Sequence, residues 1–125
     1  MSDKFLNYGL WVLKILAGLA FLAAGLAKLA GAAMMVGTFD AIGVGQWFRY
    51  VTGIIEVAGA IALFVPGFQA IGALFLGATM VGAVLAHVFI LGPSAVPAII
   101  LGIISAIILW RHRDQLPVVG NHTTA

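Results

Sequence analysis

Four long apolar stretches constrain this chain more than any other feature of its sequence. They cover approximately residues 8–30, 48–65, 70–91 and 95–110. A helix needs about 20 apolar residues to cross the roughly 30 Å of hydrocarbon in a bilayer. We therefore assign each stretch as a membrane span and predict an all-α integral membrane protein, folded as a four-helix bundle.

The composition agrees with this assignment and excludes several other classes. Hydrophobic residues make up 63% of the chain and charged residues 8%, whereas a soluble domain is about 45–50% apolar and about 25% charged. The six basic residues are scattered, so they form no patch for nucleic acid. The absence of cysteine excludes disulfides and thiol chemistry. The length allows one membrane domain, residues 1–114, and a polar tail, residues 115–125, that we expect to be frayed.

The segments between the spans predict how neighbouring helices are arranged. The turn formers PGFQ at 66–69 and GPS at 92–94 are short connections, so spans two, three and four should be antiparallel neighbours. The first connection, residues 31–47, is longer and largely apolar. Irregular backbone is not tolerated in contact with lipid tails, so we expect this interfacial or re-entrant segment to lie on the surface or to pack onto the bundle.

The basic residues indicate the orientation. Lys4 precedes the first span, and Arg111 and Arg113 follow the fourth. Arg49 is the exception, because it lies at the start of the second span, on the side of the membrane opposite to these residues. An even number of spans places both termini on one side, and the excess of positive charge makes that side cytoplasmic. The predicted location is the inner (cytoplasmic) membrane, with several crossings.

Ionisable residues inside the spans are the candidate functional residues. A charged side chain at the centre of a span costs about 2.5–3.5 kcal/mol on insertion scales, so such residues usually face the bundle interior and pair. Lys14 is close enough to the cytoplasmic end to snorkel to the interface. Lys28 is directed back into the membrane, and Glu56 is the only acidic residue within a span. His87 lies near the outer end of the third span.

Lys28, Glu56 and His87 are expected to meet in the outer half of the bundle, because spans one and three direct their side chains toward a glutamate on span two. Two interpretations remain open at this point. The cluster can fix the helix register, as buried polar pairs do in other bundles, or it can form a proton-linked or ligand-binding site. No catalytic residue and no metal ligand is assigned. Small residues at 78, 82 and 86, and at 98, 102 and 106, predict helix contacts within the bundle or in a homo-oligomer.

Several segments, taken in order, resemble the DoxX-like family of small four-span membrane proteins. AGLAKL at 24–29 is similar to the end of that family's first span. GIIEVAG at 53–59, followed by LFVPG at 63–67, is similar to its second-span glutamate motif. His87, preceded by Ala86, is similar to a histidine often found near the end of that family's third span. The resemblance implies a polar cluster of Lys28, Glu56 and His87.

The resemblance also implies a function. Some relatives are named as subunits of quinol oxidase or of thiosulfate–quinone oxidoreductase, which suggests a redox-linked accessory subunit with a quinone pocket, a redox partner protein and a lipid bilayer around it. In such a pocket Lys28 or His87 could donate a hydrogen bond to the quinone head group while Glu56 handles the proton. Two alternatives stay open: a non-catalytic assembly or packing protein, and a proton-coupled carrier of small cations.

Overall fold

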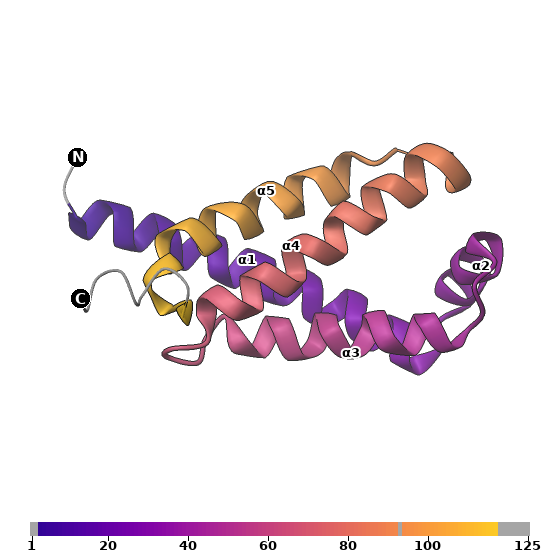
Figure 1. Cartoon of the computed structure of the whole chain (residues 1–125), viewed down its shortest axis with the longest axis horizontal. Helices are drawn as coiled ribbons and strands as arrows, with labels where there is room; N and C mark the ends of the chain where they lie inside the picture. The colour runs from indigo at the N-terminus through magenta and orange to yellow at the C-terminus, as the bar shows by residue number, and fades with distance from the viewer. Residues whose placement is uncertain (1–2, 93, 118–125) are drawn as a thin grey trace.

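A computed structural model of the chain describes residues 3–92 and 94–117 (Figure 1). No strand occurs in these two ranges, which confirms the prediction of an all-α protein. Five α-helices, a π-helical turn (η1) and a 3₁₀ turn (η2) follow in the order α1 Asp3–Ala30, α2 Ala33–Ile42, α3 Trp47–Ala62, α4 Gln69–Ala86, η1 His87–Leu91, α5 Val96–Arg111 and η2 Arg113–Gln115.

The helices α1, α3, α4 and α5 form a bundle in which successive members run in opposite directions (Figure 1). The main packed pairs are α1 with α3, α3 with α4, and α4 with α5, and α1 also contacts α5. The start of α1, the turn between α3 and α4, and the end of α5 share one end of the molecule (Figure 1), which we call the terminal end. The other end, where α2 lies, we call the α2 end.

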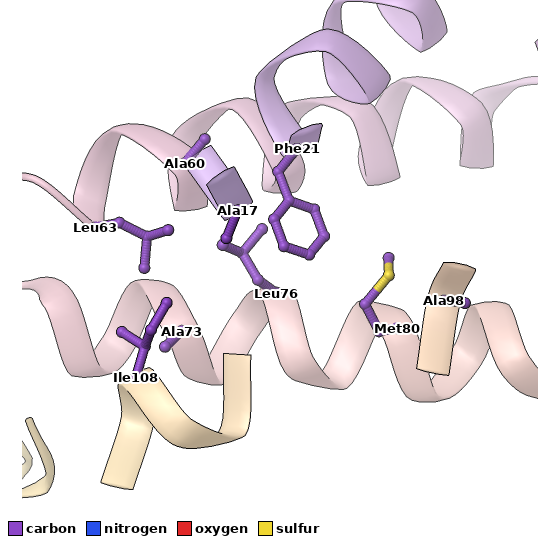
Figure 2. Close-up of a cluster of buried hydrophobic side chains, with 9 residues drawn as sticks. All are labelled: Ala17, Phe21, Ala60, Leu63, Ala73, Leu76, Met80, Ala98 and Ile108. Atoms are coloured by element: carbon purple, nitrogen blue, oxygen red, sulfur yellow. The ribbon is translucent and has the colours of Figure 1, made fainter. Parts of the chain in front are cut away.

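The core lies where the four bundle helices meet (Figure 2). It combines small and large side chains, and the small ones let the helices approach closely. The outer surface is also apolar: Leu19, Val81 and Ile103 are each more than half exposed. Large apolar patches on a surface mark contact with lipid or with another protein, as a membrane bundle requires. The buried core residues are Ala17, Phe21, Ala60, Leu63, Ala73, Leu76, Met80, Ala98 and Ile108.

The helix lengths divide the four predicted spans into two groups. Among the described residues, Asp3–Ala30 and the continuous segment Gln69–Leu91 are long and apolar enough to cross a membrane. Helices α3 and α5 have 16 residues each, which corresponds to about 24 Å at 1.5 Å per residue. They coincide closely with the predicted ranges 48–65 and 95–110, and their crossing of the bilayer stays a prediction.

The long first connection contains the short helix α2. It ends at Gly43, whose φ of 83° is left-handed and whose N–H bonds to the carbonyl of Phe39, as is common after a helix C-terminus. Helix α2 contacts η1, α3 and α1. It therefore covers the α2 end, in agreement with the expectation that this segment packs onto the bundle.

The expectation of a frayed tail from residue 115 onward is wrong at its first residue. Gln115 accepts a hydrogen bond from the backbone N–H of Ala70 at 2.9 Å and donates one to Gln69 Oε1 at 2.6 Å. The start of the predicted tail is thus held against the start of α4, because its side-chain amide satisfies polar groups there. Residues 118–125 of that tail lie outside the described residues.

Candidate functional site

Lys28 and Glu56 form a buried ion pair between α1 and α3. Lys28 Nζ lies 2.7 Å from Glu56 Oε1, and the side chains are 14% and 2% exposed. No other ion pair occurs between the residues that the structure describes. Buried charges occur in proteins when they are paired, so the contact explains how an acidic residue is accommodated in the middle of α3.

Two glycines bring α1 and α3 close enough for this pair. A Cβ atom added at Gly25 would lie 2.9 Å from the carbonyl oxygen of Gly53, and one added at Gly53 would lie 3.1 Å from the carbonyl oxygen of Gly25. Lys28 and Glu56 each follow the glycine of their own helix by three residues. Because helical side chains lean toward the N-terminus of their helix, the two charges of antiparallel helices converge over this crossing.

Arg49 is the third charged residue of the site, and the sequence interpretation did not assign it a role there. Its side chain is buried. Nη1 donates to the backbone carbonyl oxygen of Lys28, and Nε donates to Gln46 Oε1 at 2.8 Å. A guanidinium at the C-terminal end of a helix satisfies free carbonyls and interacts favourably with the helix dipole. Arg49 therefore caps α1.

The sequence marks where α1 ends but not which residue caps it. Gly31 directly follows the last residue of α1 and adopts a left-handed φ of 76°, so free carbonyl groups precede it and need donors. In the sequence interpretation, Arg49 was instead the basic residue that disagreed with the excess of positive charge on the side of the termini. Its burial removes that conflict, because a buried cap is not part of the charge exposed in a loop.

The structure does not join His87 to the pair. It is the first residue of η1, and neither Lys28 nor Glu56 is bonded to it among the described residues. Its Nδ1 atom is buried and has no hydrogen-bond partner in that part of the chain. A π-helical turn within a helix is often associated with a functional site. His87 thus remains a candidate binding residue, separate from the Lys28–Glu56 contact.

Lys14 differs from the snorkelling residue that the sequence predicted. The residue is 3% exposed. Its Nζ atom is directed toward the terminal end, where it lies 3.4 Å from His112 Nε2 and 4.2 Å from the centre of the Trp11 ring. The expected direction is observed, but the side chain is buried and ends against His112 and Trp11.

Two apolar cavities lie elsewhere on the bundle. The larger, of about 520 Å³, is a groove between α4 and α5, and small residues of the two predicted stripes, among them Ala78, Gly102 and Ala106, line it. The smaller, of about 170 Å³, lies between α1 and the end of α3. Neither is lined by Lys28, Glu56 or His87. The quinone pocket expected around the three residues therefore has no counterpart in either cavity.

The part of the chain that the structure describes contains no group of three or more His, Asp or Glu side chains placed to hold a metal ion. His87 is the only histidine within the bundle helices and η1, so a haem held by two histidines within the bundle does not fit either. The candidate functional groups are the Lys28–Glu56 pair with its Arg49 cap, and His87 in η1, the turn that contacts α2.

Comparison with known families assigns the chain. The sequence model of the DoxX-like family matches residues 12–110, which include all four bundle helices in whole or in large part. The chain belongs to the DoxX-like family. In this DoxX-like protein the matched region contains Lys28, Arg49, Glu56 and His87. It ends at Trp110, before His112 and Gln115. Neither the curated proteins nor the solved structures contain a match to the chain.

Family membership and the apolar outer surface together make this DoxX-like protein a membrane protein in contact with the lipid bilayer. The polar contacts at the terminal end lie largely outside the matched region, since His112 and Gln115 follow it. The Lys28–Glu56 pair lies inside it and is the candidate site that the family resemblance also indicated.

Proposed function

We propose that this DoxX-like protein is a redox-linked accessory subunit of a membrane assembly, and that it exchanges a proton at Glu56. The observation that carries the proposal is the ion pair of Lys28 Nζ and Glu56 Oε1 at 2.7 Å, between two tightly packed helices. Intramembrane ionisable residues are expensive and commonly mark proton relays. The family resemblance supplies the redox part of the proposal.

The pair is close enough to exchange a proton once the Lys28 ammonium turns to point an N–H at Glu56 Oε1, which lies 2.7 Å away without a hydrogen bond of good geometry. Transfer of one proton from Lys28 Nζ to Glu56 Oε1 discharges both groups across the 2.7 Å contact. The carboxyl is then free to pass its proton on, and Lys28 to accept another. Arg49, which donates to the backbone of Lys28, keeps the end of α1 in place while the charges change. Positioning of this kind is what efficient proton transfer requires.

A quinone is the cofactor that the proposal includes, and the α4–α5 groove fits its apolar tail. The groove has a volume of about 520 Å³ and an almost wholly apolar lining, which ends on the α4 side at Leu85. His87 follows two residues later, outside that lining, and its buried Nδ1 has no partner among the described residues. We propose this atom as the donor to a carbonyl of the head group. A quinone supplies two-electron chemistry coupled to proton uptake. The chain itself would bind the tail, orient the head and provide protons.

Quinone binding is tested by purifying the protein in mild detergent, extracting its lipids and measuring quinone by chromatography. Ala106→Phe fills the groove, since Ala106 lines it, whereas Ile107→Phe places the same ring one position away, outside the lining. We expect bound quinone in the wild type and in Ile107→Phe, and its loss in Ala106→Phe. Equal quinone in both variants, or none in the wild type, would refute the groove as the binding site.

Proton exchange at Glu56 has its own test. Glu56→Gln removes the proton-accepting oxygen and nearly preserves the side-chain shape, and Asp40→Asn provides a matched control because Asp40 lies on α2, outside the pair. Membranes with Glu56→Gln should lose redox-coupled proton uptake when compared with wild type at matched amounts of folded protein. Unchanged proton uptake would exclude Glu56 as the exchanging group.

A non-catalytic assembly protein is the second candidate. The close contact of Gly25 and Gly53 favours this candidate. The ion pair lies where the backbones of α1 and α3 meet, and fixing the register of these two helices would be a sufficient role for it. In that case the double variant Lys28→Met with Glu56→Gln should keep partner binding and function. The cation-carrier alternative has less support, since Lys28 already occupies the carboxylate. Proton-driven uptake of an organic cation into proteoliposomes would revive it.

The orientation and the assembly state belong to the same proposal. We infer cytoplasmic termini in an inner membrane, because Lys4, Arg111 and Arg113 flank the terminal end. A homo-oligomer would form through those small residues of the two stripes that are not already packed inside the bundle. A Cβ atom added at Gly102 lies 3.4 Å from Met80 Cβ, inside the bundle, whereas one added at Gly82 has no neighbour within 4 Å.

A further inference from the structure

A second polar cluster connects three helices at the terminal end, away from the Lys28–Glu56 pair. His112 directly follows α5, and its ring lies between two neighbours. Gln115 Nε2 is 3.4 Å from His112 Nδ1, and Lys14 Nζ of α1 is 3.4 Å from His112 Nε2. Gln115 in turn reaches Gln69 at the start of α4. We call Lys14, Gln69, His112 and Gln115 the terminal cluster.

The orientation of the Gln115 side chain follows from its other contacts. The backbone N–H of Ala70 donates to Gln115 Oε1 at 2.9 Å, so the oxygen is on that side. The amide nitrogen must then face Gln69 Oε1, which itself accepts from the backbone N–H of Gly67. Amide orientations are assigned from such networks. Gln115 therefore presents an N–H donor to the ring of His112.

Both neighbours of the His112 ring are hydrogen-bond donors, so each needs an acceptor nitrogen on the ring. The Gln115 amide offers an N–H to Nδ1, and an ammonium at Lys14 can only donate to Nε2. A neutral imidazole has one acceptor nitrogen and can serve either neighbour, whereas an imidazolium has none. A neutral ring therefore satisfies one of the two contacts at a time. Protonation of His112 removes that one acceptor and places a second positive charge beside Lys14.

We propose that His112 is a proton-binding site that controls whether the end of α5 stays attached to α1 and α4. With a neutral ring, the terminal cluster holds the three helices together. With a protonated ring, the one acceptor is lost and Lys14 repels the imidazolium. The end of α5 then moves away from α1 and draws Gln115 from the start of α4, although the bonds of Gln115 to Gln69 and Ala70 do not themselves involve the ring. This site is independent of the proposed proton exchange at Glu56, since Lys14 and Lys28 lie about 21 Å apart along α1 at 1.5 Å per residue.

The two charged groups that act on the pKa of His112 both disfavour its protonated form. Lys14 is contributed by α1 and Arg111 by the end of α5, and both are basic. Helix α4 has no ionisable side chain and contributes the neutral Gln69. In η2, Arg113 stacks on the Trp110 ring and donates to its carbonyl, and Asp114 is exposed.

Burial, followed by the charges of Lys14 and Arg111, lowers the pKa of His112 from its ordinary value of 6.5. The neutral, attached form is therefore the ground state at neutral pH. Protonation of the site therefore requires acidification below the ordinary pKa of histidine.

The experiment measures attachment and protonation in the full chain. Because the sequence has no cysteine, Phe68→Cys and Pro117→Cys can carry one spin label each, on the α3–α4 turn and beyond η2; both positions are exposed. Distances are recorded in lipid nanodiscs from about pH 8 to about pH 5. NMR of labelled histidine follows the His112 ring over the same range.

We expect one narrow distance at the alkaline end, and its loss at the acid end with the same midpoint as the His112 titration. His112→Gln keeps an acceptor but cannot take up a proton, so it should hold the narrow distance at every pH. Three results would overturn the proposal: a distance that does not change in the wild type, a midpoint that differs from that of His112, or an equal response in His112→Gln.

Discussion

Arg49 donates a hydrogen bond to the backbone carbonyl oxygen of Lys28, the same residue whose side chain pairs with Glu56. Helix α3 therefore holds one residue of α1 at two points, and the two α3 residues are seven positions apart on one helix face. The guanidinium fixes the end of α1, and the carboxylate fixes the ammonium. The Arg49 guanidinium therefore holds the backbone at the end of α1 whatever the charge of the Lys28–Glu56 pair.

Arg49→Lys should loosen the end of α1. Lysine cannot bond the Lys28 carbonyl and Gln46 together as the guanidinium fork does, so one charge-assisted hydrogen bond is lost, which costs about 1.5–3 kcal/mol. Hydrogen exchange of the Gly31 and Ala32 amides, which bond to the last turn of α1, should become faster. Arg113→Lys, at a half-buried position where the guanidinium stacks on Trp110, is the matched control. Unchanged exchange would show that Arg49 is not the cap.

Gly25→Ala should destabilise the bundle although alanine favours helices. Its Cβ would lie 2.9 Å from the Gly53 carbonyl oxygen, and overpacking of this kind costs about 1–3 kcal/mol. Gly82→Ala is the control, because its Cβ meets no atom within 4 Å and helix propensity favours it by about 0.5–1 kcal/mol. Denaturant titration in detergent compares the two. Equal stability would mean that α1 and α3 are farther apart than described.

The Lys28–Glu56 pair should show strong coupling in a double-mutant cycle. Lys28→Met leaves a buried carboxylate without its partner and should cost about 3–5 kcal/mol, unless the carboxyl takes up a proton and reduces the loss. Glu56→Gln added to Lys28→Met should recover much of it, because the buried charge is then gone. The measurement is the free energy of unfolding of all four proteins. Additive losses would show that the 2.7 Å contact does not persist.

Stability should fall with acid because of His112. In the folded protein burial and nearby cations hold the pKa of His112 below 6.5, whereas the unfolded chain titrates near the ordinary value. The contribution is therefore complete above that value and is lost as pH falls below it, since the unfolded state then binds more protons. Unfolding free energies of wild type and His112→Gln, compared across this range, should converge toward acid. Parallel curves would contradict the shift.

The sequence predicted the bundle well because the spans are determined by local properties. Long apolar stretches interrupted by glycine and proline fix where helices begin and end, and α4 continuing into η1 matches the predicted stretch 70–91. Lys28 and Glu56 could be paired because they are the opposite charges that face the bundle interior. Small residues beside both indicated how closely their helices could approach.

The remaining features depend on contacts between distant residues. No local pattern shows that Arg49 reaches the carbonyl of Lys28, or that Lys14 ends beside His112. His87 was expected in the cluster from its depth and from the lean of side chains along a regular α-helix, but it lies in a π-helical turn, where that lean does not determine the direction of the side chain. Gln115 was assigned to a polar tail because its partners, Gln69 and Ala70, are more than forty positions away.

The unequal helix lengths have a consequence for the lipids around the protein. For a chain that crosses the bilayer four times, as proposed above, α3 and α5 cover about 24 Å, less than the roughly 30 Å of hydrocarbon. Helix α1, with 28 residues, exceeds it. Lipids beside α3 and α5 must then thin while those beside α1 need not. The protein would perturb its bilayer unevenly around its circumference and would favour neighbours that relieve the thinned side.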